Sequence, residues 1–270
     1  MSFHAPASGP DYYPCRYGGS ATVFRGPRSS TTGDYIAVLG SSEVYGRYVE
    51  DPFCDQLAER TGRHVVNLGV VNGGVDVFVR DEEIMKVVAG AAHVVVQVMG
   101  AANLSNRFFT VHPRRNDRFV RHSAILGSLF PQVDFTDFAF TRHMLVRLLD
   151  ADPLAFDHVR QELRAAWIAR MRLLLGRIPC PKTLLLIERP AIGPLGPEPL
   201  FIDPDMLHAL DGLAGPTIHC ATAMTGADDL DRMVVPAGEQ ASAGVTMGPD
   251  DHARIAGMLA LRLAPKDAGR

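Results

Sequence analysis

The sequence has few of the patterns that mark metal-binding, secreted or membrane proteins. Its 270 residues include four cysteines, at positions 15, 54, 180 and 220, with no Cys-x-x-Cys pair and no Cys/His cluster of zinc spacing. We therefore expect no metal site, no disulfide framework and reduced thiols, as in cytoplasmic proteins. The first residues carry no basic segment followed by an apolar run, and no apolar run is long enough to span a bilayer. Neither a signal peptide nor a membrane contact is expected.

An excess of positive charge is also missing. The chain has 27 Lys and Arg residues against 30 Asp and Glu, for a net charge of −3. A nucleic-acid-binding protein would normally show a basic excess, so we expect no nucleic-acid partner. The hydrophobic fraction of 47% is that of an ordinary globular protein. These features favour a cytoplasmic protein that acts on a small molecule.

Five short apolar runs alternate with helical patterns along the chain. The runs at 36–39 and 93–99 show no regular polar alternation, which is typical of strands buried on both faces. The five runs predict a three-layer α/β/α sandwich around a mostly parallel five-stranded sheet, with 36–39 and 94–98 as inner strands. Residues 1–34 are rich in Pro, Gly and Ser and predict an arm packed on a single domain formed by 35–270. The expected strands are 36–39, 64–68, 93–99, 183–187 and 217–220.

Polar loops led by glycine follow the first three of these runs. Ser41, Ser42 and Glu43 follow the first, Asn72 lies after the second and Asn103 after the third. Since ligands bind at the carboxyl ends of parallel strands, we expect these residues to form one composite site. The alternative for the first loop is a Gly-Ser turn in which serine caps a helix.

Residues 104–122 are dense in basic side chains and phenylalanines, and we expect a long loop there. Loops of this length in compact domains are commonly functional, and arginine forks suit carboxylate, sulfate or phosphate groups. An anionic ligand would be held by Arg107, His112, Arg114, Arg115 and Arg118. The alternative is a solvated face whose arginines pair with nearby Asp residues.

The polar positions follow the order of the blocks of a known enzyme class. Gly40-Ser41-Ser42 ends the first strand, Asn67-Leu68-Gly69 the second, Gly100 to Asn103 follows the third, and His252 lies at the start of the last helix. In this order they resemble the SGNH/GDSL hydrolases, which cleave or transfer acyl esters. The resemblance implies a flavodoxin-like three-layer fold.

The same resemblance implies catalytic roles. Ser42 would be the nucleophile and His252 its base, while the Gly69 N–H and the Asn103 amide would hold the oxyanion. The family has Asp three residues before its histidine, where this chain has Pro249, and Asp in place of Ser41. If the last helix is aligned by its apolar residues, Thr246 takes the catalytic place and His252 matches a later, structural histidine.

A closer resemblance covers almost the whole chain. The segments Tyr13-Pro-Cys-Arg-Tyr-Gly-Gly19, Phe24-Arg-Gly-Pro27 and Asn106-Arg-Phe-Phe-Thr-Val-His-Pro-Arg-Arg-Asn-Asp-Arg-Phe119 are similar to those of the bacterial family DUF6473, a domain of unknown function. This resemblance indicates that the arginine-rich segment is characteristic of the family, and it implies no particular chemistry.

Two functions are compatible with the sequence. One is an SGNH-type esterase or acyltransferase acting on an acylated, anionic or carbohydrate-derived substrate. The other is a non-hydrolytic SGNH-like module that binds an anionic or sugar ligand, or transfers a different group. Neither requires a cofactor, and we expect none. The N-terminal arm could also contribute to a homodimer contact.

Overall fold

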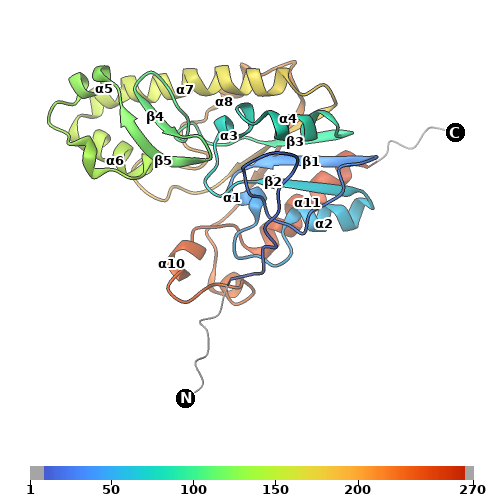
Figure 1. Ribbon diagram of the computed structural model, residues 1–270. Helices are drawn as coiled ribbons and strands as arrows, with labels where there is room; N and C mark the ends of the chain where they lie inside the picture. The colour runs from blue at the N-terminus through green and yellow to red at the C-terminus, as the bar shows by residue number, and fades with distance from the viewer. Residues whose placement is uncertain (1–8, 265–270) are drawn as a thin grey trace.

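Five parallel strands form the centre of the computed structural model, which describes residues 9–264 (Figure 1). The strand order is β2-β1-β3-β6-β7, and all four pairings are parallel. The predicted parallel sheet is confirmed, and its strands match the five apolar runs to within two residues at each end. They are β1 (Tyr35–Gly40), β2 (His64–Gly69), β3 (His93–Gln97), β6 (Lys182–Glu188) and β7 (Gly215–Ala221).

The two inner strands are the ones that the sequence indicated. Every residue of β1 is buried, as are four of the five residues of β3. Side chains alternate along β1, so that Ala37 and Leu39 enter one core, whereas Ile36 and Val38 enter the other. A strand with a core on each face needs an unbroken apolar run, and this is what the sequence contains.

Helices cover both faces of the sheet. One core is closed by α3 (Val75–Val79), α4 (Glu82–Ala89) and α7 (Pro153–Gly176). The other is closed by α2 (Phe53–Thr61) and α11 (Pro249–Leu263), which lie on the opposite side in Figure 1. The result is a three-layer α/β/α arrangement, as predicted.

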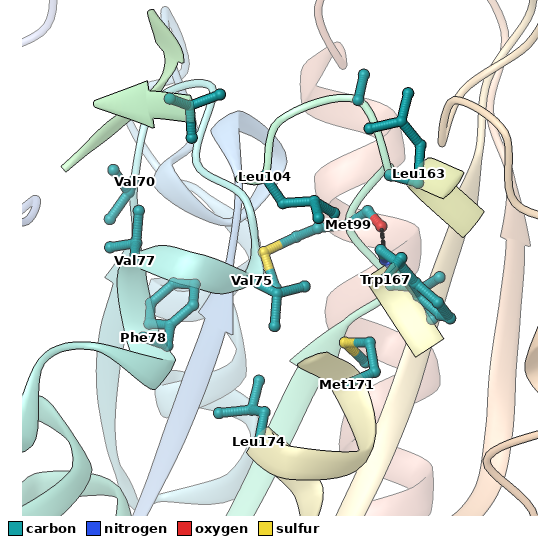
Figure 2. Close-up of a cluster of buried hydrophobic side chains, with 14 of the residues drawn as sticks. Val70, Val75, Val77, Phe78, Met99, Leu104, Leu163, Trp167, Met171 and Leu174 are labelled. Atoms are coloured by element: carbon teal, nitrogen blue, oxygen red, sulfur yellow. Dashed lines mark hydrogen bonds between the residues drawn. The ribbon is translucent and has the colours of Figure 1, made fainter. Parts of the chain in front are cut away.

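The long helix α7 shows how local sequence produces this packing. The Asp152 side chain accepts hydrogen bonds from the N–H groups of Leu154 and Ala155, and Pro153 occupies the first turn. Buried residues then recur every three or four positions, and Trp167 donates its indole N–H to the Met99 carbonyl at 2.7 Å (Figure 2). This contact joins α7 to the segment that follows β3.

The segment expected to be a long loop is largely a β-hairpin. Strands β4 (Phe109–His112) and β5 (Arg115–His122) pair antiparallel, with register shifts around Val111. Phe109 and Val111 are buried and alternate with less buried residues, which is the pattern of a half-buried strand. The prediction of a loop is therefore wrong. The many basic residues suggest a loop, although Phe109 and Val111 already alternate with more polar residues as in a strand.

The hairpin belongs to a lobe at one end of the molecule, where it lies with α5 (Ala124–Leu129) and α6 (Thr141–Ala151) (Figure 1). Before α6, a 3₁₀ turn, η1 (Phe135–Asp137), is capped by the Asp134 side chain, which accepts the Thr136 N–H. Helix α8 (Pro204–His208) has Asp203 as its N-cap. Short helices complete the chain: α1 (Ser42–Tyr45), α9 (Ala227–Leu230) and α10 (Gln240–Ala243).

A buried carboxylate ties the lobe to the helical layer. Asp76 has an exposure of 0% and forms ion pairs with Arg80 at 3.1 Å and Arg170 at 2.8 Å. It also accepts the Ser105 N–H at 3.0 Å. Asp76 therefore connects α3, α7 and the segment that leads into the hairpin.

The N-terminal arm packs closely against the turn after β1. Within residues 9–34, Tyr17 and Phe24 are buried. The guanidinium of Arg25 donates to the carbonyls of Gly46 at 2.5 Å and Glu50 at 2.7 Å. Residues 1–8 of the predicted arm and 265–270 of the predicted domain lie outside the described part of the chain, and the domain boundary at 34/35 stays a prediction.

Within residues 9–264, no helix is both long enough and apolar enough to cross a membrane.

Candidate functional site

The turn after β1 places two serines at the carboxyl edge of the sheet. β1 ends at Gly40, where a Cβ would lie 2.3 Å from the Gln97 Oε1 and from a Val44 methyl group, so only glycine fits. The Ser41 N–H then donates to Gln97 Oε1 at 2.7 Å, and Ser42 opens α1. Both serine side chains are half-buried rather than enclosed.

Ser42 lies in a hydrogen-bonded cluster with two other predicted site residues. Its Oγ accepts the Asn72 N–H at 2.9 Å and donates to Asn72 Oδ1 at 3.2 Å. The Asn103 amide donates to the Asn72 carbonyl at 3.2 Å. Asn72 has a positive φ of 54°, which asparagine tolerates better than most residues. The structure thus brings together residues that follow three different strands.

The hairpin lobe contributes residues that sequence reasoning missed. Asp117 on β5 accepts the Asn72 amide at 3.2 Å, and the buried Asn116 accepts the Gly74 N–H at 3.0 Å. Thr141 at the start of α6 donates to Asn103 Oδ1 at 2.7 Å. Asn116 and Asp117 lie inside the arginine-rich segment and could have been found as hydrogen-bonding positions there. Thr141 has no distinguishing signal in the sequence.

A second polar cluster lies beside the first. Glu43 forms an ion pair with Arg189 at 2.5 Å and accepts the Gln97 amide at 2.8 Å. The Glu43 and Arg189 side chains are only 13% and 10% exposed. Arg189 also donates to the carbonyl of Val245, which precedes the position where the alignment of the last helix put the catalytic histidine. No pattern in the sequence singles out Arg189, which directly follows β6.

His252 lies inside the second core, between α11 and α2. Its exposure is 1%, its Nδ1 accepts the Phe53 N–H at 3.1 Å, and its ring stacks on that of Phe53. Burial lowers the pKa of His252 from 6.5 to about 3, so the ring is neutral at pH 7. These contacts give His252 a structural role at the start of α2. Both hydrogen-bonding partners of Ser42 Oγ within residues 9–264 belong instead to Asn72.

Gly69 also has contacts that differ from those of the expected oxyanion donor. Its N–H already donates to Asn67 Oδ1 at 2.9 Å. A Cβ at this position would lie 2.2 Å from the Tyr45 nitrogen. Glycine is therefore required so that α1 can pack against the end of β2.

The predicted anion-binding residues fall into two groups. Some have hydrogen-bonding or ion-pair partners within the protein, and the others have no carboxylate partner among the described residues. Arg107 pairs with Glu162 at 2.8 Å, and His112 Nδ1 accepts the N–H groups of Arg114 and Arg115 in the hairpin turn. The Arg118 guanidinium lies 4.1 Å from the centre of the Phe140 ring. Within residues 9–264, the side chains of Arg114, Arg115 and Arg118 have no carboxylate within 4.0 Å, and the first two are exposed.

The arrangement is suited to binding hydroxyl-bearing ligands. Ser42, Asn72 and Asn103 line neither of two cavities of about 560 and 630 Å³ elsewhere in the molecule. Among the described residues there is no group of three His, Cys, Asp or Glu side chains placed to hold a metal ion. The amides and carboxylate can instead donate to and accept from ligand hydroxyls.

Comparison with known proteins identifies the family. No curated protein and no solved structure matches the chain. The model of one family, described as a domain of unknown function (DUF6473), matches residues 1–266, which is nearly the whole chain. The chain therefore belongs to the DUF6473 family.

Proposed function

We propose that the carboxyl edge around Ser42 binds a small sugar-derived ligand that carries an anionic group, without hydrolysing it. The observation that carries this proposal is the hydrogen-bonded cluster of Ser42, Asn72, Asn103 and Asp117. Side-chain amides and a carboxylate at this edge provide donors and acceptors for sugar hydroxyls. Arg114 and Arg115, which directly precede Asn116 and Asp117, would hold the anionic group.

The position of the cluster in the sheet supports the proposal. In sheets of this kind, ligands bind outside the carboxyl ends of the strands, where successive connections leave in opposite directions. In the order β2-β1-β3-β6-β7, that point lies between β1 and β3. Ser42 follows β1 and Asn103 follows β3, so the cluster lies at the switch point. The same order, 2-1-3-4-5 when only the sheet strands are counted, supports a flavodoxin-like or SGNH-like fold.

The contacts of the expected catalytic groups favour binding over hydrolysis. A serine hydroxyl needs a base to accept its proton, and an amide such as Asn72 has no basic group. His252 is buried against Phe53, and the Gly69 N–H is bonded to Asn67. Pro249 stands where the SGNH enzymes have the aspartate that orients their histidine.

A calorimetric titration tests the proposal. Sugar phosphates, sugar sulfates and uronic acids should bind, and their neutral parent sugars should bind more weakly. Added salt should lower the affinity for the anionic sugars but not for the neutral ones. The double variant Arg114→Ala with Arg115→Ala should lower the affinity for the anions. Arg60→Ala is the matched control, because it removes an exposed arginine charge on α2. If no anionic sugar binds, or if the double variant binds like the wild type, the proposal is wrong.

The second candidate is an SGNH-type esterase or acyltransferase. It is favoured by Ser42 at the first strand end together with Asn103 in the same cluster. A fluorophosphonate probe and a short-chain aryl ester would then react with the wild type, and Ser42→Ala would abolish both reactions. Turnover that survives in Ser42→Ala, or a wild type that is inert to both reagents, would eliminate this candidate.

A further inference from the structure

A cavity of about 630 Å³ lies at the other end of the sheet, where one face of the edge strand β7 is not covered by a long helix among residues 9–264. Cys220 of β7 points into the core closed by α11. The residues that alternate with it, His219 and Ala221, are exposed and form the floor of the cavity with Leu186 of β6. The opposite wall includes Leu207 of α8. The sheet therefore offers a partly apolar surface that the described residues leave open.

The wall of this cavity is fixed by the chain rather than by a flexible loop. Arg189 and Glu198 pair through both backbone hydrogen bonds, at 2.9 and 3.0 Å. Four prolines, at positions 190, 197, 199 and 204, line the cavity, and each restricts its own φ angle. The cavity is preformed, and its volume lies within the range of about 300–1,000 Å³ that is usual for small-molecule sites.

The charges around the cavity are mostly negative. Four carboxylates line it, of which Glu198 pairs with Arg142, and Asp203 pairs with Arg164. Glu188 and Asp211 have no cation within 4.0 Å among residues 9–264. The lining guanidinium, that of Arg189, is already paired with Glu43. A ligand in this cavity would therefore meet a partly apolar floor and two carboxylates without counter-ions among the described residues.

We infer that this cavity binds a small amphipathic cation, namely an amine or amidine group on an aromatic or aliphatic body. The apolar body would cover Leu186, Ala221 and Leu207, and the cation would neutralise Glu188 or Asp211. Strand β7 lies three positions from β1, or about 14 Å at the usual strand spacing. The cation site is therefore separate from the cluster around Ser42 and does not depend on the function proposed there.

Calorimetric titration with matched probes tests the inference. Phenethylamine, tryptamine, hexylamine and benzamidine are the cations, phenethyl alcohol is the neutral analogue and phenylacetate is the anionic one. We expect at least one of the four cations to bind at millimolar concentration or below. Phenethyl alcohol and phenylacetate should bind about tenfold more weakly than phenethylamine, or not at all. Added salt should lower the affinity for the cations only.

Two variants locate the binding. The double variant Glu188→Gln with Asp211→Asn should lower the affinity for the cation by about tenfold or more. The control Glu59→Gln removes an exposed carboxylate on α2 and should leave this affinity unchanged. Ala221→Phe should fill the cavity and abolish binding with an unchanged melting temperature, since Ala221 is exposed. The inference is overturned if none of the cations binds, if the neutral or anionic probe binds as tightly as phenethylamine, or if neither variant weakens the cation.

Discussion

The two ends of the sheet's carboxyl edge differ in charge, in cover and in shape. At the β1–β3 end, the hairpin lobe contacts the loops that follow the strands, and it adds Asp117 and two exposed arginines to a cluster of hydrogen-bonded amides that lines neither of the two cavities. At the β6–β7 end, a cavity with a partly apolar floor is bordered by carboxylates. The net charge of −3 is close to neutral because it sums a basic and an acidic region. The charge of the whole chain therefore does not predict the charge of the ligand at either end.

The largest expected difference between the two ends is in their contribution to stability. Asp76→Ala removes the buried carboxylate that ties the hairpin lobe to α7, and should cost about 3 kcal/mol. This cost lies toward the low end of the range for broken buried ion pairs. The side chains of Arg80 and Arg170 are partly exposed, so both guanidinium groups can be solvated once Asp76 is removed. Asp211→Ala, at the cavity end, should change the free energy of unfolding by about 0.5 kcal/mol or less. Urea unfolding measures both, and similar costs would contradict the comparison.

A smaller effect is expected from Arg189, which belongs to both ends. Arg189→Met removes the partner of the largely buried Glu43 and should cost about 2 kcal/mol. Pairing it with Glu43→Gln should recover part of the loss, because no unpaired carboxylate is then left. A double-mutant cycle in urea shows the coupling. If the two single costs simply add, Glu43 and Arg189 do not act as a pair.

The pH dependence of stability distinguishes the buried histidine from an exposed catalytic one. His252 has a folded-state pKa of about 3, against 6.5 when it is exposed, so the unfolded chain binds the proton first. Its stabilising effect is complete above pH 6.5 and is lost as the pH falls toward about 3, by up to about 1.4 kcal/mol per pH unit. His252→Gln should flatten this part of the urea-unfolding profile. An unchanged profile would show that His252 is not buried in its neutral form.

A small effect is expected from Thr141, which connects α6 to the cluster around Ser42 by a hydrogen bond. Thr141→Val keeps the shape of the side chain and removes its hydrogen bond to Asn103, at a cost of about 1 kcal/mol. Binding of an anionic sugar should weaken because the Asn103 amide loses its orientation, whereas cation binding at the β6–β7 cavity should not change. Equal losses at both ends would indicate a general loosening of the fold.

Much of the β1–β3 end can be predicted from the sequence, because its residues directly follow apolar runs. Ser42, Asn72 and Asn103 must lie near one another once the strands are parallel and neighbouring. Asp117 and Thr141 cannot be placed in this way, since their positions depend on a hairpin whose register shifts near Val111. The burial of His252 agrees with its helical spacing from Ile255 and Leu259, and with the alignment of the last helix by its apolar residues, but its contact with Phe53 depends on how α11 packs against α2.

The cavity end is harder to predict for the same physical reason. In β7 the polar residues Thr217 and His219 alternate with Ile218 and Cys220, which is typical of a strand with one exposed face, yet this pattern alone does not place β7 at the edge of the sheet or show that the described residues leave a cavity there. Strand order and the reach of α8 decide this, and both arise from tertiary packing.

The buried Arg25 has a consequence for a chain cut by a protease. Its guanidinium holds carbonyls at the end of the turn that carries Ser42, while the exposed residues 32–34 separate it from β1. Cleavage of the backbone at residues 32–34 would leave the sheet intact. The arm would then be a separate peptide, bound to the domain only by non-covalent contacts such as those of Arg25. The Ser42 turn would then lose its shape on dilution, as the peptide dissociates, and regain it when the peptide is added back.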